Sequence, residues 1–163
     1  MALSEKQKSN LKINIPIWID LLMKNDVSPE VIPFILAQMI LETGWFSSDA
    51  YKIDNNPAGV TWNNNYKTRT GTTIGIQRKE GGNYVHFDNY QNAVVDYIRI
   101  LNRKSKPIEA KDINDFANRL AKNGYYEISR TPVAQYTKTL NSVYNRIQQN
   151  VDVATLLQKK KRF

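Results

Sequence analysis

Residues 35–45 read Ile-Leu-Ala-Gln-Met-Ile-Leu-Glu-Thr-Gly-Trp, an apolar run whose one formal charge, Glu42, stands just before a glycine. Apolar side chains continue upstream through residues 31–34, so the predicted helix is hydrophobic on nearly every face and should cross the centre of the domain. Gly44 supplies the left-handed residue with which such a helix commonly ends. The sequence therefore predicts a carboxyl group at the end of a buried helix.

The position of Glu42 has a chemical consequence. Burial in a medium of low dielectric disfavours the ionised carboxylate and raises its pKa, so Glu42 should hold a proton near neutral pH. That is the property of a general acid. Gln38 lies four residues earlier and therefore shares a helix face with Glu42. The competing interpretation is an exposed glutamate in the last turn of a helix, which such a turn tolerates at small cost.

The composition limits the possible classes of function. A chain of 163 residues with 41% hydrophobic residues can bury its own core. We expect one domain over residues 1–163, with a catalytic core of about 11–150 and a basic tail over 151–163. The absence of cysteine excludes thiolate catalysis and Cys-based metal sites, and a single histidine, His86, argues against a His-based metal cluster or a serine–histidine relay. No metal and no cofactor are expected.

The net charge of +8 predicts affinity for polyanions, which include nucleic acids and anionic cell-envelope polymers. Residues 159–162 carry half of this excess and are interpreted as a solvated, frayed tail. No run is long enough to span a bilayer, so we expect no membrane insertion. The N-terminus lacks the apolar segment of a secretory signal, so lysis, a holin or a virion would have to deliver the protein to a cell wall. We expect a monomer.

The first half of the chain predicts two helices followed by a loop. Pro16 indicates that the first helix, within residues 11–24, starts near it. Ser28 is the expected N-cap of the second helix, and Pro33 is the alternative start. Residues 46–65 are rich in Ser, Asp and Asn and predict loops and turns.

The second half predicts a small β lobe and then three helices. Residues 66–87 favour two strands joined by a turn at 80–83. Helical stripes follow over residues 90–101, 113–121 and 133–147, the second capped by Asp112 and ended by Gly124. Their tyrosines, at positions 90, 97, 136 and 144, are assigned to the core because helical spacing accounts for them.

The residues after the apolar helix are typical of a carbohydrate cleft. Asn55 and Asn56 can donate to and accept from hydroxyl and acetamide groups. Several aromatic residues can offer flat faces to sugar rings: Trp45, Trp62, Tyr66, Tyr125 and Tyr126.

Four segments, in order, carry a resemblance to a known family. They are AQMILETGW (37–45), NNPAGV (55–60), VHFDNYQNAVVDY (85–97), and NGY (123–125) with Tyr136 downstream. Together they resemble motifs of bacterial β-N-acetylglucosaminidases of glycoside hydrolase family 73. The resemblance implies a mainly α (α+β) lysozyme-like fold, in which a helical bundle and a small β-hairpin lobe flank a glycan-binding groove. It also implies hydrolysis of the GlcNAc-β-1,4-MurNAc bond of peptidoglycan, the expected partner.

The resemblance also implies roles for single residues. Glu42 matches the catalytic glutamate that protonates the leaving oxygen, and Tyr125 matches the functional tyrosine beside the reacting sugar. Asn56 and Gly59 match a loop that shapes the cleft floor.

The second catalytic group is left open by the sequence. Some family members carry a carboxylate after a Thr-Thr pair in the β lobe, but here Thr72-Thr73 is followed by Ile74. Glu80 in the hairpin turn, or Asp54, could replace it. The acetamide oxygen of the substrate could also attack the anomeric carbon, as in some glycosidases that act on N-acetyl sugars.

Other functions remain compatible with the sequence. A muramidase or lytic transglycosylase would use one acid in the same fold. A non-catalytic glycan-binding or structural module would keep the fold without the reaction. The charge would permit a nucleic-acid binder, but no recognised nucleic-acid motif is present, so nucleic acid is not an expected partner.

Overall fold

The computed structural model describes residues 2–126 and 131–161, which form seven α-helices, two short 3₁₀ helices and one hairpin. The helices are α1 (Glu5–Lys24), α2 (Ile32–Thr43), α3 (Asp49–Asp54), α4 (Tyr90–Leu101), α5 (Ile113–Asn123), α6 (Val133–Asn150) and α7 (Val153–Lys161). The 3₁₀ helices are η1 (Asn64–Thr68) and η2 (Pro107–Glu109), and the strands are β1 (Thr72–Gln77) and β2 (Asn83–Phe87). The prediction of a mainly α, lysozyme-like fold with a small β lobe is confirmed.

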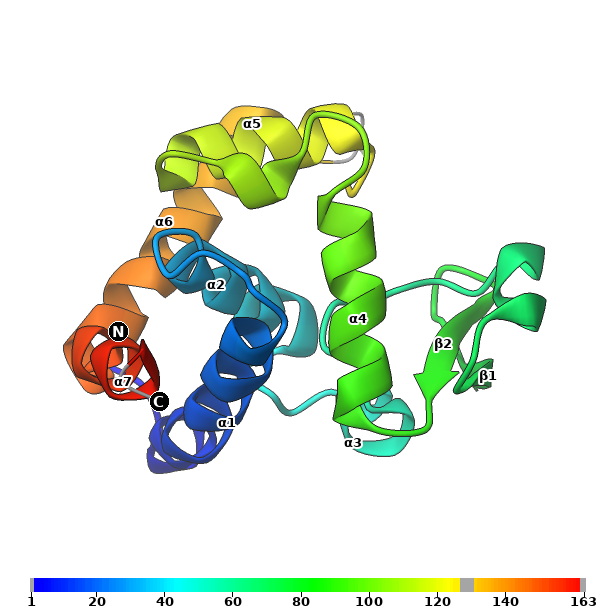
Figure 1. Cartoon of the computed structure of the whole chain (residues 1–163), viewed down its shortest axis with the longest axis horizontal. Coiled ribbons are helices and arrows are strands. Elements are labelled where there is room, and N and C mark those ends of the chain that lie inside the picture. Colours follow the sequence, from blue (N-terminus) through cyan, green and yellow to red (C-terminus); the bar gives the residue numbers. More distant parts are fainter. Residues whose placement is uncertain (1, 127–130, 162–163) are drawn as a thin grey trace.

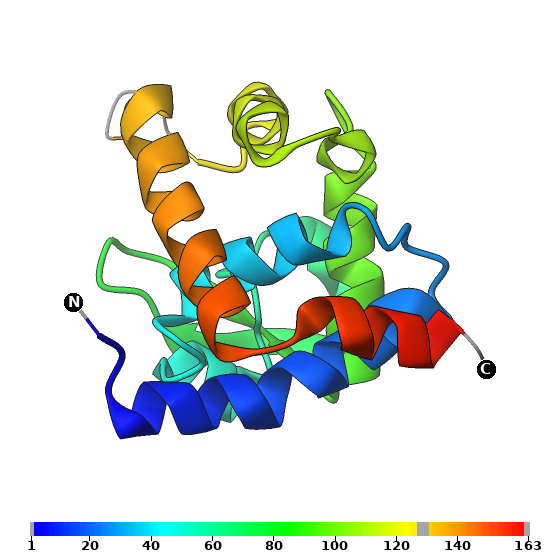
Figure 2. The same cartoon turned by 90° about the vertical axis from the view of Figure 1, so that its left-hand side faces the viewer.

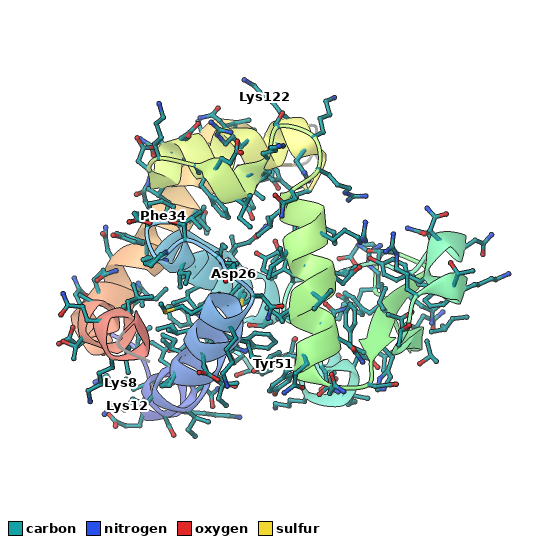
Figure 3. All side chains as sticks on the ribbon, viewed as in Figure 1. Lys8, Lys12, Asp26, Phe34, Tyr51 and Lys122 are labelled. Atoms are coloured by element: carbon teal, nitrogen blue, oxygen red, sulfur yellow. The ribbon has the colours of Figure 1, made fainter. Side chains whose placement is uncertain are left out.

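Helix α2 forms the centre of the helical part, as predicted. Its residues from Ile35 to Ile40 are all buried, and α6 and α1 pack against it (Figure 2). Phe34, near its start, contacts the rings of Phe116 in α5 and Tyr144 in α6 at centroid distances of 6.1 and 6.0 Å (Figure 3). Gly44 ends the helix at φ 53°, the left-handed conformation that favours glycine. Glu42 thus lies in the last turn of a helix that the core surrounds.

The hairpin forms a lobe beside α4, on the side of that helix away from α1, α6 and α7 (Figure 1). The strands pair antiparallel, with Thr72 opposite Phe87 and Ile74 opposite Val85. The predicted turn between them is confirmed, since the amide of Arg78 donates to the carbonyl of Gly82. The strands are shorter than predicted because Tyr66 belongs to η1.

The expected start of the first helix near Pro16 is wrong, because α1 begins eleven residues earlier, at Glu5. Ser4 and Gln7 form a reciprocal capping box there, which satisfies two backbone donors that the helix end would leave free. Pro16 lies inside the helix, where its ring removes one hydrogen bond to the carbonyl of Lys12, an exposed residue. Buried apolar residues on both sides of the proline stabilise the helix across it.

Two expectations between residues 25 and 65 also fail. Ser28 does not cap α2, because its hydroxyl contacts the carboxylate of Glu30. The helix begins at Ile32, one residue before the alternative start at Pro33. The stretch expected as loop contains α3, which begins because the side chain of Ser48 accepts from the amide of Tyr51.

The three helices predicted after the hairpin are confirmed as α4, α5 and α6, with Asp112 capping α5 and Gly124 ending it. Helix α7 packs along α1 with Val153 buried (Figure 2). Of the tail predicted over residues 159–162, the part up to Lys161 is helical, so the prediction of fraying is wrong there, whereas Lys159 is exposed as expected. Arg162 lies outside the described residues. None of the described helices combines the length and the hydrophobicity that crossing a membrane requires.

Candidate active site

Glu42 is partly buried in the last turn of α2, with its carboxyl group among aromatic side chains. Burial raises the pKa of Glu42 to about 7, and a hydrogen bond from Tyr136 opposes this rise in part. The cause is the one expected from the apolar neighbours in the sequence. A substantial fraction of Glu42 therefore carries a proton at neutral pH, as a general acid requires.

Tyr136 of α6 is the closest hydroxyl partner of this carboxyl group. Its Oη lies 3.4 Å from Oε1 of Glu42, although the two residues are 94 positions apart in the chain. Burial raises the pKa of the Tyr136 hydroxyl, and the charge of Glu42 raises it further, so Tyr136 remains a proton donor toward the carboxylate. The assignment of Tyr136 to the core is correct for its ring but missed this contact. Its place downstream of the NGY segment was the only signal in the sequence.

Gln38 extends the polar group behind Glu42. It is fully buried, at 0% exposed, and its Oε1 accepts a hydrogen bond from the hydroxyl of Tyr97 in α4. Its side chain also partly offsets the rise in the pKa of Tyr136 that burial causes. The helix face that Gln38 and Glu42 share, as predicted, thus contacts Tyr97 of α4 and Tyr136 of α6.

The loop after α3 brings a glycine against the acid. A Cβ placed on Gly59 would lie 3.2 Å from Oε2 of Glu42, and Gly59 has a φ of 64°. Asn56 holds this loop in shape, since its amide donates to the carbonyls of Val60 and Val85 and its oxygen accepts from the amide of Val60. Asn56 is 1% exposed. The expected role of Asn56 and Gly59 in shaping the cleft floor fits this geometry, whereas direct substrate binding by Asn56 does not.

Tyr125 of the segment after α5 also contacts this loop. Its hydroxyl donates to the carbonyl of Ala58, the neighbour of Gly59. Burial raises the pKa of Tyr125, and the charges of Tyr97 and Glu42 contribute to this rise. Tyr125 and Glu42, which are 83 positions apart in the sequence, therefore lie against neighbouring residues of one loop.

A polar pocket of about 230 Å³ opens beside this loop. Its lining includes Gly59 and Tyr125, the η1 region of the β lobe, and three arginines: Arg69, Arg99 and Arg103. A larger hollow of about 640 Å³ lies between α1 and the start of α4, but its lining contains none of the residues around Glu42. The smaller pocket is therefore the part of the surface that continues the Glu42 site.

The aromatic residues predicted to bind sugar fall into different environments. Tyr66 is 3% exposed and donates to Oδ2 of Asp96 at 2.8 Å, so its ring face is not open for stacking, although it forms part of the pocket wall. Trp62 is partly exposed beside it, with ring centroids 5.8 Å apart. Tyr126 stacks on Tyr136 at 3.9 Å and 10° and thereby supports the tyrosine that contacts Glu42.

Asn55 has a structural role in this fold. It ends α3 at φ 53°, and its side-chain amide donates to the carbonyl of Phe87 at 2.8 Å. Its open side faces the larger hollow beside α1 rather than the pocket of Tyr125. The structure thus places Asn55 apart from the other predicted site residues.

The two carboxylates considered as partners of Glu42 differ in their environments. Asp54 is 2% exposed; its Oδ1 lies 2.9 Å from Nδ1 of His86, and its Oδ2 accepts from the amide of Ile76 at 2.9 Å. Both oxygens therefore hold α3 to the hairpin, which argues against a role opposite Glu42. Glu80 is exposed in the hairpin turn, where Arg78 lies 3.9 Å away. Within residues 2–126 and 131–161, no group of three or more His, Asp or Glu side chains could hold a metal ion.

Comparisons with known proteins identify the family of this chain. The family described as glucosaminidase, mannosyl-glycoprotein endo-β-N-acetylglucosaminidase, matches residues 15–149. No curated protein and no solved structure gave a significant match. The matched region spans α2, the hairpin and nearly all of α6, and so includes Glu42, Gly59, Tyr125 and Tyr136. The chain therefore belongs to the glucosaminidase family, whose general activity is the hydrolysis of glycans.

Proposed function

We propose that this protein is a peptidoglycan hydrolase that cleaves the GlcNAc-β-1,4-MurNAc bond, with Glu42 as the general acid. The observation that carries the proposal is the pKa of about 7 at Glu42, on a helix end beside a polar pocket, in a chain of the glucosaminidase family. The net charge of +8 favours an acidic cell-wall polymer over a neutral, mannose-rich glycan.

In this reaction, protonated Glu42 donates its proton to the glycosidic oxygen as the bond from that oxygen to the anomeric carbon breaks. The leaving sugar then departs as an alcohol, and Glu42 is left as a carboxylate. The anomeric carbon bonds either to water directly or first to an attacking oxygen that water later displaces, so that the second product is a reducing sugar. Tyr136 stabilises that carboxylate by donating to Oε1. Tyr125 keeps the loop of Gly59 in place through Ala58, so that the carboxyl group has a fixed position.

The group opposite Glu42 is the second part of the proposal. Because both oxygens of Asp54 are already bound, Glu80 is the carboxylate of the β lobe that remains open to a substrate. If Glu80 acts as base or nucleophile, Glu80→Gln should lower kcat at least 100-fold, the usual order for such a group. If the acetamide of the substrate acts instead, Glu80→Gln should stay active and N-deacetylated glycan should resist cleavage.

The test of the acid is a digestion of purified peptidoglycan by the native chain, Glu42→Gln and Tyr125→Phe. Glu42→Gln should lose at least about 100-fold in rate, more than Tyr125→Phe loses. Glu109→Gln is the matched control, because Glu109 is exposed on η2 and should leave the rate unchanged. If Glu42→Gln digests the wall as fast as the native chain, the assignment of the acid is wrong.

Mass spectrometry of the products identifies the bond. New reducing ends at GlcNAc support the proposal, whereas reducing MurNAc indicates a muramidase and anhydro-MurNAc a lytic transglycosylase. A mannose-rich glycoprotein in a parallel digestion tests the substrate that the family description names. If no glycan is cleaved but peptidoglycan binds, the protein is a non-catalytic glycan-binding module.

A further inference from the structure

The pocket beside Tyr125 carries an excess of positive charge that proton donation by Glu42 does not require. Three arginines line it, and the described lining residues include no aspartate or glutamate. They come from two separate segments of the chain, since Arg69 follows η1 whereas Arg99 and Arg103 lie at the end of α4 and just after it. The position of each arginine in its own segment does not explain why the three side chains meet in one pocket.

Only one of these guanidinium groups is neutralised within the described residues. Arg99 lies 2.8 Å from Oδ1 of Asp96 and 3.2 Å from the hydroxyl of Tyr66. The side chains of Arg69 and Arg103 form no hydrogen bond or ion pair with another described residue, and Nε of Arg69 is buried without a partner. The pocket therefore presents two cations that an anionic ligand could neutralise.

Tyr66 positions two of the three arginines. The guanidinium carbons of Arg69 and Arg99 lie 5.7 and 5.9 Å from the centre of its ring, within the range of cation–π attraction. The hydroxyl of Tyr66 is in turn held by Asp96. Two like charges beside one ring repel each other, and a bound anion would relieve that repulsion. The planar fork of arginine suits carboxylate in particular.

We infer that this pocket is a subsite for a carboxylate carried by the glycan substrate. The inference rests on the proposed peptidoglycan hydrolase. The pocket shares Gly59 and Tyr125 with the Glu42 site, so a strand across Glu42 can place a substituent there. Its volume of about 230 Å³ is below the roughly 300–1,000 Å³ of pockets that hold a whole small ligand. The size therefore suits a substituent of a longer chain.

Peptidoglycan has two sources of such a carboxylate: the free carboxyl groups of the stem peptide, and the lactyl carboxyl of MurNAc after the peptide is removed. Three soluble substrates distinguish them: glycan strands with stem peptides, the same strands with every carboxyl converted to its methylamide, and strands stripped of peptide by an amidase. Binding is measured by calorimetry in the Glu42→Gln background, so that no substrate is consumed. The rate of hydrolysis is measured separately with native Glu42.

The variants are Arg69→Gln, Arg103→Gln and the double variant. Arg103 is exposed, and its side chain forms no hydrogen bond or ion pair with the described residues, so its variant should fold normally. Each change should weaken binding of the peptide-bearing strands about three- to tenfold, as expected for one arginine–carboxylate contact. The effect should disappear with the methylamide strands. If the variants instead bind the stripped strands more weakly than the parent chain does, the lactyl carboxyl is the ligand.

Arg146→Gln on α6 is the matched control and should leave binding of all three substrates unchanged. Equal losses with the peptide-bearing and the methylamide strands, or no loss with any of the three substrates, would overturn the subsite. The outcome is distinct from failure of the proposed function. If the chain hydrolyses peptidoglycan but its binding does not depend on these arginines, only the subsite is refuted. If the chain binds the charged strands through these arginines but cleaves none of them, only the proposed hydrolase activity is refuted.

Discussion

Gly59 and Glu42 are in such close contact that a single methyl group at position 59 would crowd the carboxyl group. The added Cβ would lie 3.2 Å from Oε2, and the glycine has a φ of 64°. The loop after α3 and the end of α2 therefore depend on glycine at this point for two reasons, the backbone conformation and the space for the acid.

Gly59→Ala should lower the rate of hydrolysis about tenfold, because even a small displacement of a reacting group is costly. Because alanine is strained in the left-handed conformation, the substitution should also lower the free energy of unfolding by about 1–2 kcal/mol. Gly82→Ala is the control, since Gly82 has a φ of 72° with open space around it. It should show the loss in stability and keep the rate. Equal rates for the two variants would show that contact with Glu42 is unimportant.

Glu42 should make the stability of the protein depend on pH. Its pKa rises from 4.5 to about 7 on folding, so the folded state binds the proton more tightly than the unfolded state. Its contribution is fully present below pH 4.5 and is lost as the pH rises through about 7, a total of up to roughly 3 kcal/mol. Glu42→Gln removes this dependence. Urea unfolding at pH 5 and pH 8 should therefore show a smaller difference in the variant than in the native chain, and an equal difference would contradict the burial of the acid.

Tyr136→Phe should move the alkaline limb of the pH–rate profile to higher pH. The hydrogen bond from Tyr136 lowers the pKa of Glu42, so its removal lets that pKa rise and keeps Glu42 protonated over a wider range. The rate on the acidic side should change only a few-fold, since the ring is retained. Tyr144→Phe, on the same helix and without a described hydrogen bond, should leave the profile in place. A downward shift in Tyr136→Phe would refute this role.

Asp54→Asn should weaken the fold rather than the chemistry. The asparagine side chain has one oxygen and no charge, whereas the carboxylate offers one oxygen to Ile76 and the other to His86, so the free energy of unfolding should fall by about 1–3 kcal/mol. Asp88→Asn, at an exposed position just after β2, should change it by less than about 0.5 kcal/mol. Denaturant unfolding and the rate at saturating substrate separate the two effects. Loss of the rate without loss of stability would instead make Asp54 catalytic.

Features that depend on neighbours in the chain were predictable from the sequence. The apolar run around Glu42, the left-handed Gly44 and the Asp112 cap all follow from periodicity or from a single turn, and α2 and α5 formed as expected. The start of α1 was missed because Pro16 outweighed the capping box at Ser4 and Gln7. A short helix such as α3 has too few residues for a periodic pattern, so it was taken for loop.

Which side chains meet across the chain was decided only by the tertiary structure. The sequence by itself determined a mainly helical chain, a small hairpin and an acid at the end of a buried helix. The packing of α2 against α6 determined that Tyr136 would contact this acid. The packing of η1 against α4 determined that Tyr66 would be buried and that three arginines would share one pocket. Periodicity specifies which face of an element is apolar, but the partner of a polar group on that face depends on how the elements pack. For this reason the buried carboxyl group of Glu42 could be predicted from its own segment, whereas the groups that contact it and line the neighbouring pocket could not.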